Sequence, residues 1–238
     1  MLKSKIGKSL KYLSSYTFFL FSIAVLFLFL LSDFVKAQEP TTLPGATVGK
    51  PSIEEAEKLL AERGYWITKV DGVKDASTYH ALTAFQKVEG LKRTGVLTQI
   101  EVAALRNSTR PAAGVPNGTA HIEIDIRRQV LFLVDENNLV TRILPISSGS
   151  EKRYFDEGKW QIALTPLGVF QITRQIKATR RAPLGTLFHP NYFVGGIAVH
   201  GSDSVPFRPA SHGCVRIPHF ASTEFSDLVW VGMPVHVF

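Results

Sequence analysis

The sequence holds a single cysteine, Cys214, in the run SHGCVR at positions 211–216. An exported protein normally pairs or omits its cysteines, because an unpaired thiol is open to oxidation. The N-terminus of this chain looks like an export signal, so an unpaired thiol indicates a chemical use for the sulfur. His200 and Gly201 follow the apolar run 197–199, fourteen residues upstream of the cysteine. We therefore interpret Cys214 and His200 as a nucleophile and its base.

The residues around the thiol fit attack on a carbonyl group. A thiol must become a thiolate to attack, and its ordinary pKa of about 8.5 leaves it mostly protonated at neutral pH. His200 is the expected proton acceptor, and the fixed charge of Arg216 would lower the pKa of the thiol. Gly213 lets the backbone turn sharply, so that neighbouring N–H groups can face a developing oxyanion. Arg216 could also hold a substrate carboxylate in a forked contact.

The first 37 residues predict a secretory signal peptide. They combine a lysine-rich flank, an apolar stretch at 18–31 and the tripeptide VKA at 35–37, after which we expect cleavage. An uncleaved signal anchor is the alternative, because residues 16–35 nearly reach the ~20 residues that span a bilayer. Under both interpretations the rest of the chain is exported to the periplasm or cell wall, either secreted or tethered. The membrane is then contacted only through this segment.

Composition excludes several classes of function. Residues 1–37 hold five of the 27 basic residues and one of the 20 acidic ones, so the remainder carries a net charge of only +3. Nucleic-acid binding needs clustered Lys and Arg, and we expect no nucleic-acid partner. No His or carboxylate cluster has the spacing of a metal site, and no glycine-rich phosphate loop is present. We therefore expect neither a metal nor a cofactor.

Two segments rich in Pro, Thr and Gly divide the exported part. The first, residues 38–50, is expected to be a linker. The second, residues 108–118, separates a helical pattern at 51–107 from a strand pattern at 119–238 and is the expected domain boundary. We predict a small three-helix α domain followed by a mainly β domain, a sandwich or barrel with one small helix.

The helical pattern contains three short helices. Ser52 with Glu55, and Thr98 with Glu101, have the spacing of capping boxes and predict the starts of the first and third helices. An apolar stripe over residues 81–88 predicts the helix between them.

After residue 118 the period of the apolar residues changes to two. Strands separated by polar turns at 121–126, 130–134 and 139–144 predict an antiparallel meander. Further strands are expected at 168–172, 196–199 and 234–238, with a helix at 220–229.

The His-Gly pair at 200–201, followed by SHGCVR at 211–216, resembles the signature of the L,D-transpeptidases, exported cysteine enzymes that remodel peptidoglycan. The resemblance covers residues 119–238 and includes TPLGVF at 165–170 and GMPV at 232–235. It implies that Cys214 is the nucleophile and that His200 accepts and donates the proton.

The resemblance also implies roles for the neighbouring residues. Ser211 and Gly213 would shape the loop, and backbone N–H groups of residues 213–214 would form the oxyanion hole. A main-chain carbonyl would orient the imidazole, with Asp203 as the alternative. Substrate contacts are expected from four residues: Arg216, His212, Gly201 and Tyr192.

Residues 51–107 resemble the three-helix peptidoglycan-binding domain found beside many wall enzymes. The matching parts are VDG at 70–72, AFQ at 84–86 and TGVLT at 94–98. The resemblance implies a glycan or wall partner for this region, and a plain spacer bundle is the alternative. Tyr65 and Trp66 could present a sugar-stacking surface or could close the core of the bundle.

The reaction implied by the resemblance is a two-step acyl transfer in peptidoglycan biosynthesis. The thiolate attacks the carbonyl of the L-centre of diaminopimelate in a tetrapeptide stem, releases the terminal D-alanine and forms a thioester. The side-chain amine of a second stem then captures the acyl group as a 3–3 cross-link. Water as acceptor would instead give an L,D-carboxypeptidase. A non-catalytic wall-binding module is the third alternative, and the presence of both His200 and Cys214 argues against it.

The remaining histidines have weaker signals. His189 and Tyr192 precede the strand of His200 and could line the groove for the donor stem or pack at the surface. His80, His121, His219 and His236 are expected to be ordinary surface or edge residues.

Overall fold

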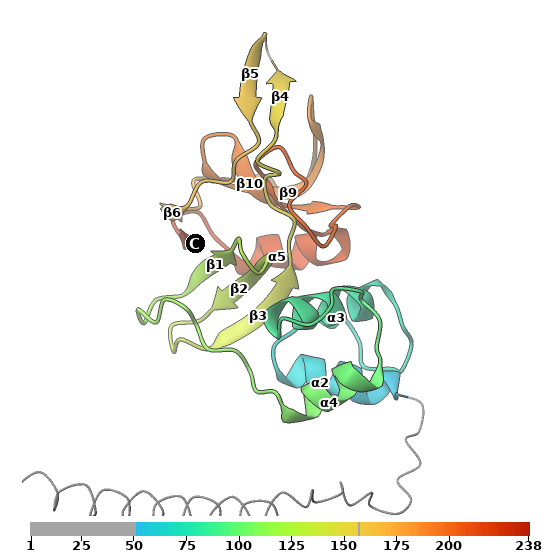
Figure 1. Cartoon of the computed structure of the whole chain (residues 1–238). Helices are drawn as coiled ribbons and strands as arrows, with labels where there is room; N and C mark the ends of the chain where they lie inside the picture. Colours follow the sequence, from blue (N-terminus) through green and yellow to red (C-terminus); the bar gives the residue numbers. More distant parts are fainter. Residues whose placement is uncertain (1–50, 157) are drawn as a thin grey trace, which may run out of the picture. The chain divides into compact units, whose positions relative to one another are not determined.

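The computed structural model describes residues 51–156 and 158–238. The predicted signal segment, residues 1–37, and the predicted linker, residues 38–50, lie outside the described residues. Within the described residues, none of the helices combines the length and the apolar character that crossing a membrane requires. In this described part of the chain, three α-helices precede a mainly β region with one short α-helix, which confirms the predicted fold class (Figure 1).

The first sheet has five strands in the order β3-β2-β1-β12-β6. Their bounds are His121–Asp125 (β1), Val130–Val134 (β2), Val140–Pro145 (β3), Gly168–Gln171 (β6) and Pro234–Val237 (β12). The first three strands form the antiparallel meander expected from the alternating pattern. The strand β12 pairs in parallel with β1 and antiparallel with β6, so it lies inside the sheet.

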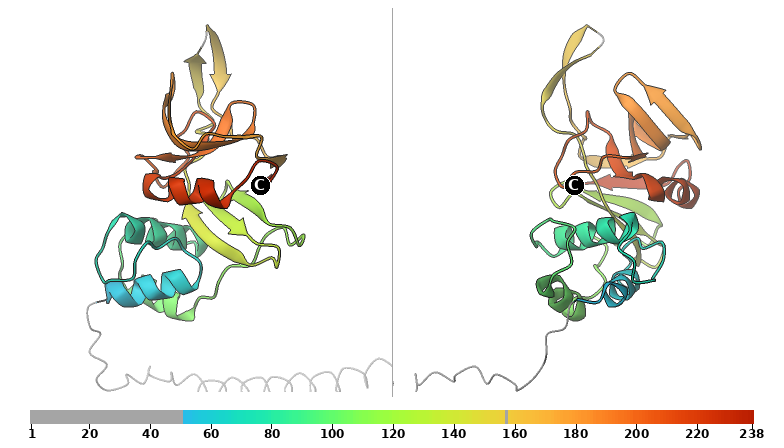
Figure 2. Two further views of the ribbon diagram at one scale, coloured as in Figure 1. Left: turned by 180° about the vertical axis from the view of Figure 1, so that it is seen from behind. Right: turned by 90° about the vertical axis from the view of Figure 1, so that its right-hand side faces the viewer.

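The second sheet carries the cysteine motif. Its strand order is β11-β10-β9-β7, and β8 also pairs with β9. The bounds are Arg174–Gln175 (β7), Thr179–Ala182 (β8), Gly185–Val194 (β9), Ile197–Ser202 (β10) and Val215–Pro218 (β11). A 3-10 turn at His219–Ala221 (η1) and the helix α5 at Ser222–Leu228 follow. A separate two-stranded hairpin, β4 (Arg153–Asp156) with β5 (Lys159–Ile162), projects from the sheets (Figure 2).

One hydrophobic core joins the two sheets. It contains alternate residues of β1, β2 and β12, such as Ile122, Leu131 and Val235, and it meets residues of the second sheet such as Val199 and Val215. Because neighbouring residues of a strand point to opposite faces, His200 and Arg216 lie on the outer face of the second sheet. The core therefore fixes which side chains of this sheet are available for chemistry.

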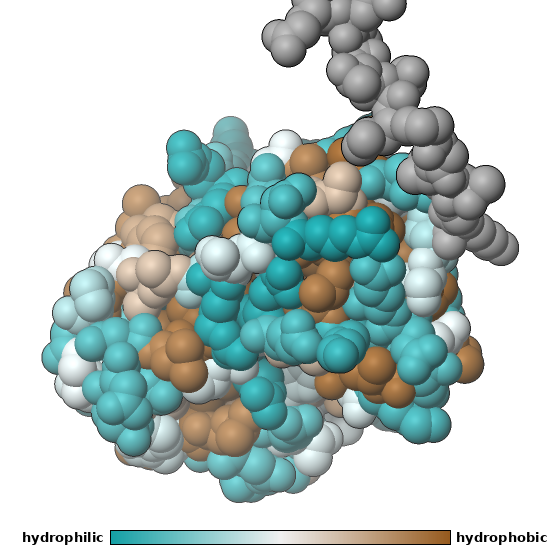
Figure 3. All heavy atoms as spheres, turned by 90° about the horizontal axis from the view of Figure 1, so that it is seen from below, coloured by the Kyte–Doolittle hydropathy of each residue, from teal (hydrophilic) through white to brown (hydrophobic). Residues whose placement is uncertain are grey.

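The three helices are α2 (Ile53–Glu62), α3 (Ala76–Val88) and α4 (Gln99–Asn107). Thr98 and Glu101 form the expected capping box at α4. At α2 the Ser52 side chain accepts the Glu55 N–H, without the reciprocal bond. A further capping box, between Asp75 and Thr78, starts α3. Seen from the side of α2 and α4, the surface is mainly hydrophilic with small separate hydrophobic spots (Figure 3).

A second hydrophobic core joins the helices to the first sheet. Phe85 and Leu82 of α3 pack in one cluster with Val130 and Phe132 of β2. All five residues of β2 are buried, because one face meets the helices and the other meets the second sheet. Residues 51–156 and 158–238 accordingly belong to one compact unit.

Tyr65 and Trp66 belong to these cores. Both side chains are 3% exposed, and the Trp66 N–H donates to the Ile143 carbonyl of β3. Tyr65 also packs edge-on against Phe85. Burial of both rings confirms the core role and rules out a sugar-stacking surface at this position.

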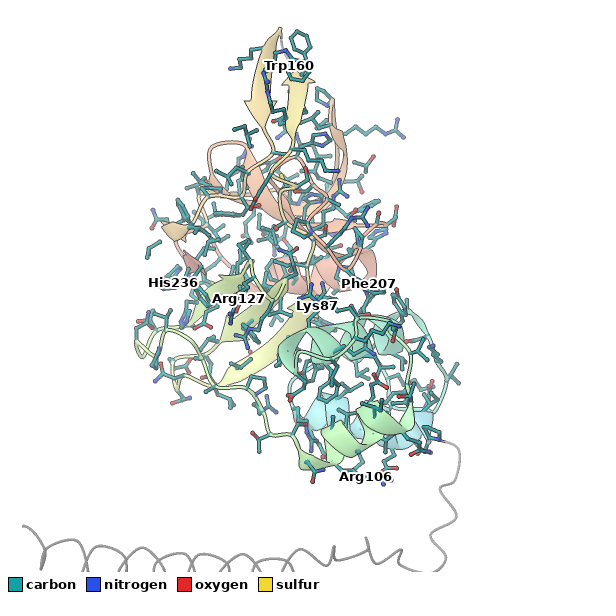
Figure 4. All side chains as sticks on the ribbon, viewed as in Figure 1. Lys87, Arg106, Arg127, Trp160, Phe207 and His236 are labelled. Carbon is teal, nitrogen blue, oxygen red and sulfur yellow. The ribbon has the colours of Figure 1, made fainter. Side chains whose placement is uncertain are left out.

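Hydrogen bonds add to the contact between helices and sheet. The ammonium group of Lys87, at the boundary between α3 and the strands, donates to the carbonyls of Gln129 and Ile146 at 3.0 and 2.8 Å (Figure 4). The predicted linker, residues 108–118, is hydrogen-bonded both to the helical region and to the first sheet. Arg110 donates to the Glu62 and Val140 carbonyls, and the Glu123 carboxylate accepts the N–H groups of residues 114 and 115.

Candidate active site

The pairing of β10 with β11 places the thiol beside the imidazole. These strands are parallel, with Val199 opposite Val215 and His200 opposite Arg216. Cys214 immediately precedes β11, so its position along the sheet is that of Ala198. Residues 198 and 200 share a face, and the side chains of Cys214 and His200 therefore point to the same side of the sheet.

Both side chains line one pocket of about 500 Å³. Ser211, His212 and Arg216 of the same motif also line it. The other walls come from Tyr154, Gln161, Ile162 and Leu164 on one side, from the β8–β9 turn at 184–187, and from Gly196, Ile197, Ser202 and Ser204. The pocket thus brings together five of the eight residues predicted for the site and exposes the sulfur to a ligand.

The imidazole of His200 is held by its own strand. Its Nδ1 lies 2.7 Å from the Gly201 carbonyl oxygen. A carbonyl can only accept, so Nδ1 carries the proton and Nε2 is left as the basic nitrogen. This is the main-chain orientation that the family resemblance implied. Asp203, the alternative, pairs with His219 Nδ1 at 2.8 Å instead.

Residues 203–214, here called the cysteine loop, are fixed at several points. The Ser148 carbonyl accepts the N–H groups of Ala210 and Ser211. Arg93, which follows α3, donates to the Phe207 carbonyl at 3.0 Å. The helical region therefore supports the loop that carries Cys214.

Gly213 and Ser211 shape the turn before the thiol. Gly213 has a φ of +134°, and a Cβ on it would lie 3.0 Å from the Leu164 carbonyl oxygen. Its own carbonyl accepts the Thr165 hydroxyl at 2.6 Å. The Ser211 hydroxyl donates to the Cys214 carbonyl and accepts the Gly213 N–H at 3.0 Å. The Gly213 N–H is thus used within the loop.

Burial favours the neutral forms of both reacting groups. The pKa of His200 is lowered to about 4, mainly by desolvation and to a smaller extent by the Arg216 charge, while the hydrogen bond to the Gly201 carbonyl opposes the shift. Desolvation raises the pKa of the Cys214 thiol, although the Ala198 N–H and the Arg216 charge oppose this. The sequence predicted a thiol pKa lowered by Arg216, and this is corrected, because desolvation outweighs that charge in the free protein.

Two of the residues predicted to contact substrate, Gly201 and Tyr192, lie outside the pocket lining. Gly201 alternates with His200 and faces inward, where an added Cβ would lie 2.5 Å from the Ser222 Cβ. The absence of a side chain lets α5 pack closely against β10, and the Gly201 carbonyl orients the imidazole. Tyr192 is buried beneath the guanidinium groups of Arg174 and Arg180, at 4.1 and 5.6 Å from its ring centre, and Arg180 donates to its hydroxyl. Neither residue lines the pocket.

The other histidines lie away from the pocket lining. His189 contacts the hydroxyls of Ser222 and Thr223 near α5. His121 is fully buried beside Glu123, 3.1 Å from its carboxylate, so the expected surface position is wrong. Among the residues that the structure describes, no group of three or more His, Cys, Asp or Glu side chains is arranged to hold a metal.

The sequence analysis missed the hairpin that forms one pocket wall. Tyr154 of β4 packs edge-on against His212, with ring centres 4.8 Å apart, and its hydroxyl lies 3.3 Å from the Gln161 side-chain oxygen. The signal was the turn-forming DEG at 156–158 between two short segments that carry aromatic residues. Such a segment predicts a hairpin, but its sequence does not show that the hairpin reaches the cysteine.

Comparisons with known proteins agree with this geometry. Residues 119–237 match the family of the L,D-transpeptidase catalytic domain, and residues 49–105 match the putative peptidoglycan binding domain. The chain is similar to the crystal structure of an L,D-transpeptidase from Xylanimonas cellulosilytica, with 36% identity and a TM-score of 0.75. That match covers 80% of this chain and 95% of the other. An L,D-transpeptidase from Stackebrandtia nassauensis is 20% identical, over 80% and 93% of the two chains, with a TM-score of 0.47. The comparison with curated proteins gives no match.

Proposed function

The chain belongs to the L,D-transpeptidase family, and from this premise we propose that Cys214 carries an acyl group between two peptidoglycan stem peptides. The observation that supports this most strongly is that Cys214 and His200 line one pocket while the Gly201 carbonyl leaves Nε2 of the imidazole as the base. The pocket is large enough for part of a peptide, and Arg216 in its lining offers a guanidinium to a stem carboxylate.

The first step forms the thioester. His200 Nε2 takes the thiol proton as the sulfur attacks the carbonyl carbon of the L-centre of diaminopimelate in a tetrapeptide stem. The Gly213 N–H is bonded to Ser211, so the Cys214 N–H is the candidate donor to the oxyanion. When the intermediate collapses, the imidazolium returns the proton to the amine of D-alanine, which leaves.

The second step transfers the acyl group. The side-chain amine of a second stem attacks the thioester, and His200 removes a proton from the attacking nitrogen. The carbon–sulfur bond breaks, the sulfur regains a proton from the imidazolium, and a 3–3 cross-link results. Because burial favours the neutral thiol and the neutral imidazole, proton transfer accompanies attack and does not precede it as a stable ion pair.

The helical region supplies the second link to the wall. Residues 49–105 match a putative peptidoglycan binding domain, and we assign a wall contact to the polar side of α2 and α4. The aromatic residues Tyr65 and Trp66 are buried, so that contact uses other side chains. An enzyme with these substrates works outside the cytoplasm, which the predicted signal segment at 1–37 would achieve.

Intact-mass spectrometry with one defined tetrapeptide tests the reaction. The wild-type protein should gain the mass of a tripeptide acyl group and release D-alanine, whereas Cys214→Ala should gain nothing. His200→Ala should acylate roughly 10²- to 10⁴-fold more slowly, the range for loss of a general base. Acylation of the Cys214→Ala protein would disprove the assignment. With excess tetrapeptide, cross-linked dimers support transfer, and tripeptide alone would make the protein an L,D-carboxypeptidase.

A further inference from the structure

The β4–β5 hairpin is built differently from the rest of the β region. Its register pairs Arg153 with Ile162, Tyr154 with Gln161 and Phe155 with Trp160. It projects away from the two sheets, and Trp160 lies toward its far end (Figures 2 and 4). A two-stranded hairpin is at best marginally stable by itself, so large exposed apolar residues on it need a reason.

One face of the hairpin is an exposed aromatic surface. Phe155 and Trp160 are each 61% exposed and pack edge-to-face, with ring centres 5.6 Å apart. The Arg153 guanidinium lies 4.9 Å from the centre of the Trp160 ring. Ile162 is on the same face by register and is also 61% exposed. We call these four residues the aromatic face.

The aromatic face meets the active-site pocket at Ile162, which belongs to both. Tyr154 and Gln161, on the other face of the hairpin, line the pocket, and so does Ile162. Tyr154 also contacts His212 of the cysteine motif. A ligand that leaves the pocket along Ile162 therefore meets Trp160 within two residues of the same strand.

The chemistry of this surface fits a sugar ring. Pyranose rings have faces of C–H groups that lie flat on indole and phenyl rings, while their hydroxyl and amide groups seek polar partners. Arg153 and the indole N–H offer such donors beside the rings. A membrane surface is a poorer fit, because Asp156 lies opposite Lys159 at the far end of the hairpin and the charges there are mixed.

We propose that the aromatic face binds an N-acetylated amino sugar of the glycan strand whose stem peptide occupies the pocket. The inference rests on the proposed function, since the stem places the sugar beside the hairpin. The peptide and sugar are covalently joined, so each contact raises the effective concentration of the other. The hairpin would thus distinguish stems attached to glycan from free peptides.

Two donors that share one tetrapeptide test the proposal. One is the free tetrapeptide, and the other carries its disaccharide of N-acetylated amino sugars. We compare second-order rates of Cys214 acylation for the wild type, for Trp160→Ala and for Trp230→Ala, a control ring that is 48% exposed and outside the pocket lining. Trp160→Ala should slow the disaccharide donor about tenfold, the loss typical of a well-packed aromatic contact. The free tetrapeptide should stay within about twofold, and Trp230→Ala should leave both donors unchanged.

Other outcomes would overturn the proposal. Equal losses on both donors would show that Trp160 only shapes the pocket wall, and no loss on either would show that it binds nothing.

Binding of peptide-free glycan strands, followed by tryptophan fluorescence, separates this proposal from the reaction. A fluorescence response that disappears in Trp160→Ala supports sugar binding, whether or not the donors acylate Cys214. Failure of both donors to acylate Cys214 would disprove the proposed function and leave the sugar site standing. The protein could instead respond to vesicles of phosphatidylglycerol and phosphatidylethanolamine, in a Trp160-dependent way, and not to glycan. That result would overturn the proposal and show that the aromatic face binds a membrane.

Discussion

The two sides of the active-site pocket are supported in opposite ways. The cysteine loop is supported by the helical region, through Arg93 at the Phe207 carbonyl and through Lys87 at the Ile146 carbonyl, close to Ser148. The β4–β5 hairpin, on the other side, is a separate two-stranded sheet with exposed rings. Cys214 thus lies on the side that is supported by buried residues, and the sugar contact that we propose falls on the side that is not.

The difference teaches that the helices have two roles in this chain. They share a hydrophobic core with β2 and β3, so they are part of the folding unit of the catalytic region as well as a match to a wall-binding family. The hairpin contributes little to any core. Substitutions on the two sides should therefore separate stability from substrate choice.

Phe85→Ala should have the largest effect. The ring is fully buried between α3 and the sheet, and truncation of such a residue costs about 3–5 kcal/mol. Urea unfolding followed by circular dichroism of the helices and by hydrogen exchange of the β10 amides should show one shared transition at lower urea. Melting of the helices alone, with the β10 amides still protected from exchange, would contradict the single folding unit.

Lys87→Met should remove a pH dependence of stability. Desolvation, and then the charge of Arg93, lower the pKa of Lys87 from its ordinary value of 10.5 to about 7. Between these pH values the unfolded chain binds more protons than the folded one, so wild-type stability rises with pH. The slope from this group approaches about 1.4 kcal/mol per pH unit.

Unfolding free energies at pH 7 and pH 9 measure this effect. The wild type should gain roughly 2 kcal/mol over the variant across that range. Other titrating groups are common to both proteins and cancel in the difference. Parallel pH profiles would mean that the two carbonyls keep Lys87 charged.

Trp160→Ala should have the smallest effect on stability. The ring is largely exposed and packs on Phe155 and Arg153 of its own hairpin, so the unfolding free energy should change by no more than about 0.5 kcal/mol. Urea unfolding at pH 7, beside Trp230→Ala, measures this. A loss of unfolding free energy above about 2 kcal/mol would show that the hairpin contributes to the stability of the fold and would remove the contrast with the cysteine loop.

Local signals predicted most of the helices and strands correctly. Capping residues located α4, and alternating apolar residues located β1 to β3. The run VLFLV at 130–134 is apolar at every position, which is typical of a strand covered on both faces. That run was a signal for the contact between helices and sheet, and the sequence analysis did not use it.

The prediction of pocket-lining residues succeeded for those in the cysteine motif. It failed for residues whose position depends on tertiary contacts. Alternation along β10 already places Gly201 opposite to His200, so its absence from the pocket lining was predictable. The covering of Tyr192 by Arg174 and Arg180 was not, because those residues come from β7 and β8, short strands that carry no apolar pattern. The pKa of Cys214 likewise depends on burial, which a motif does not reveal.

The parallel pairing of β10 and β11 fixes the distance between the Cys214 sulfur and the His200 imidazole. The offset between sulfur and imidazole follows from the spacing of two neighbouring strands, about 4.8 Å, and from their register. The chain that crosses from one strand to the other does not set this distance. Exposed side chains of this loop that lie outside the pocket lining, such as Asp203 and Arg208, can therefore change in sequence or be replaced by design while the sulfur and the imidazole keep their alignment.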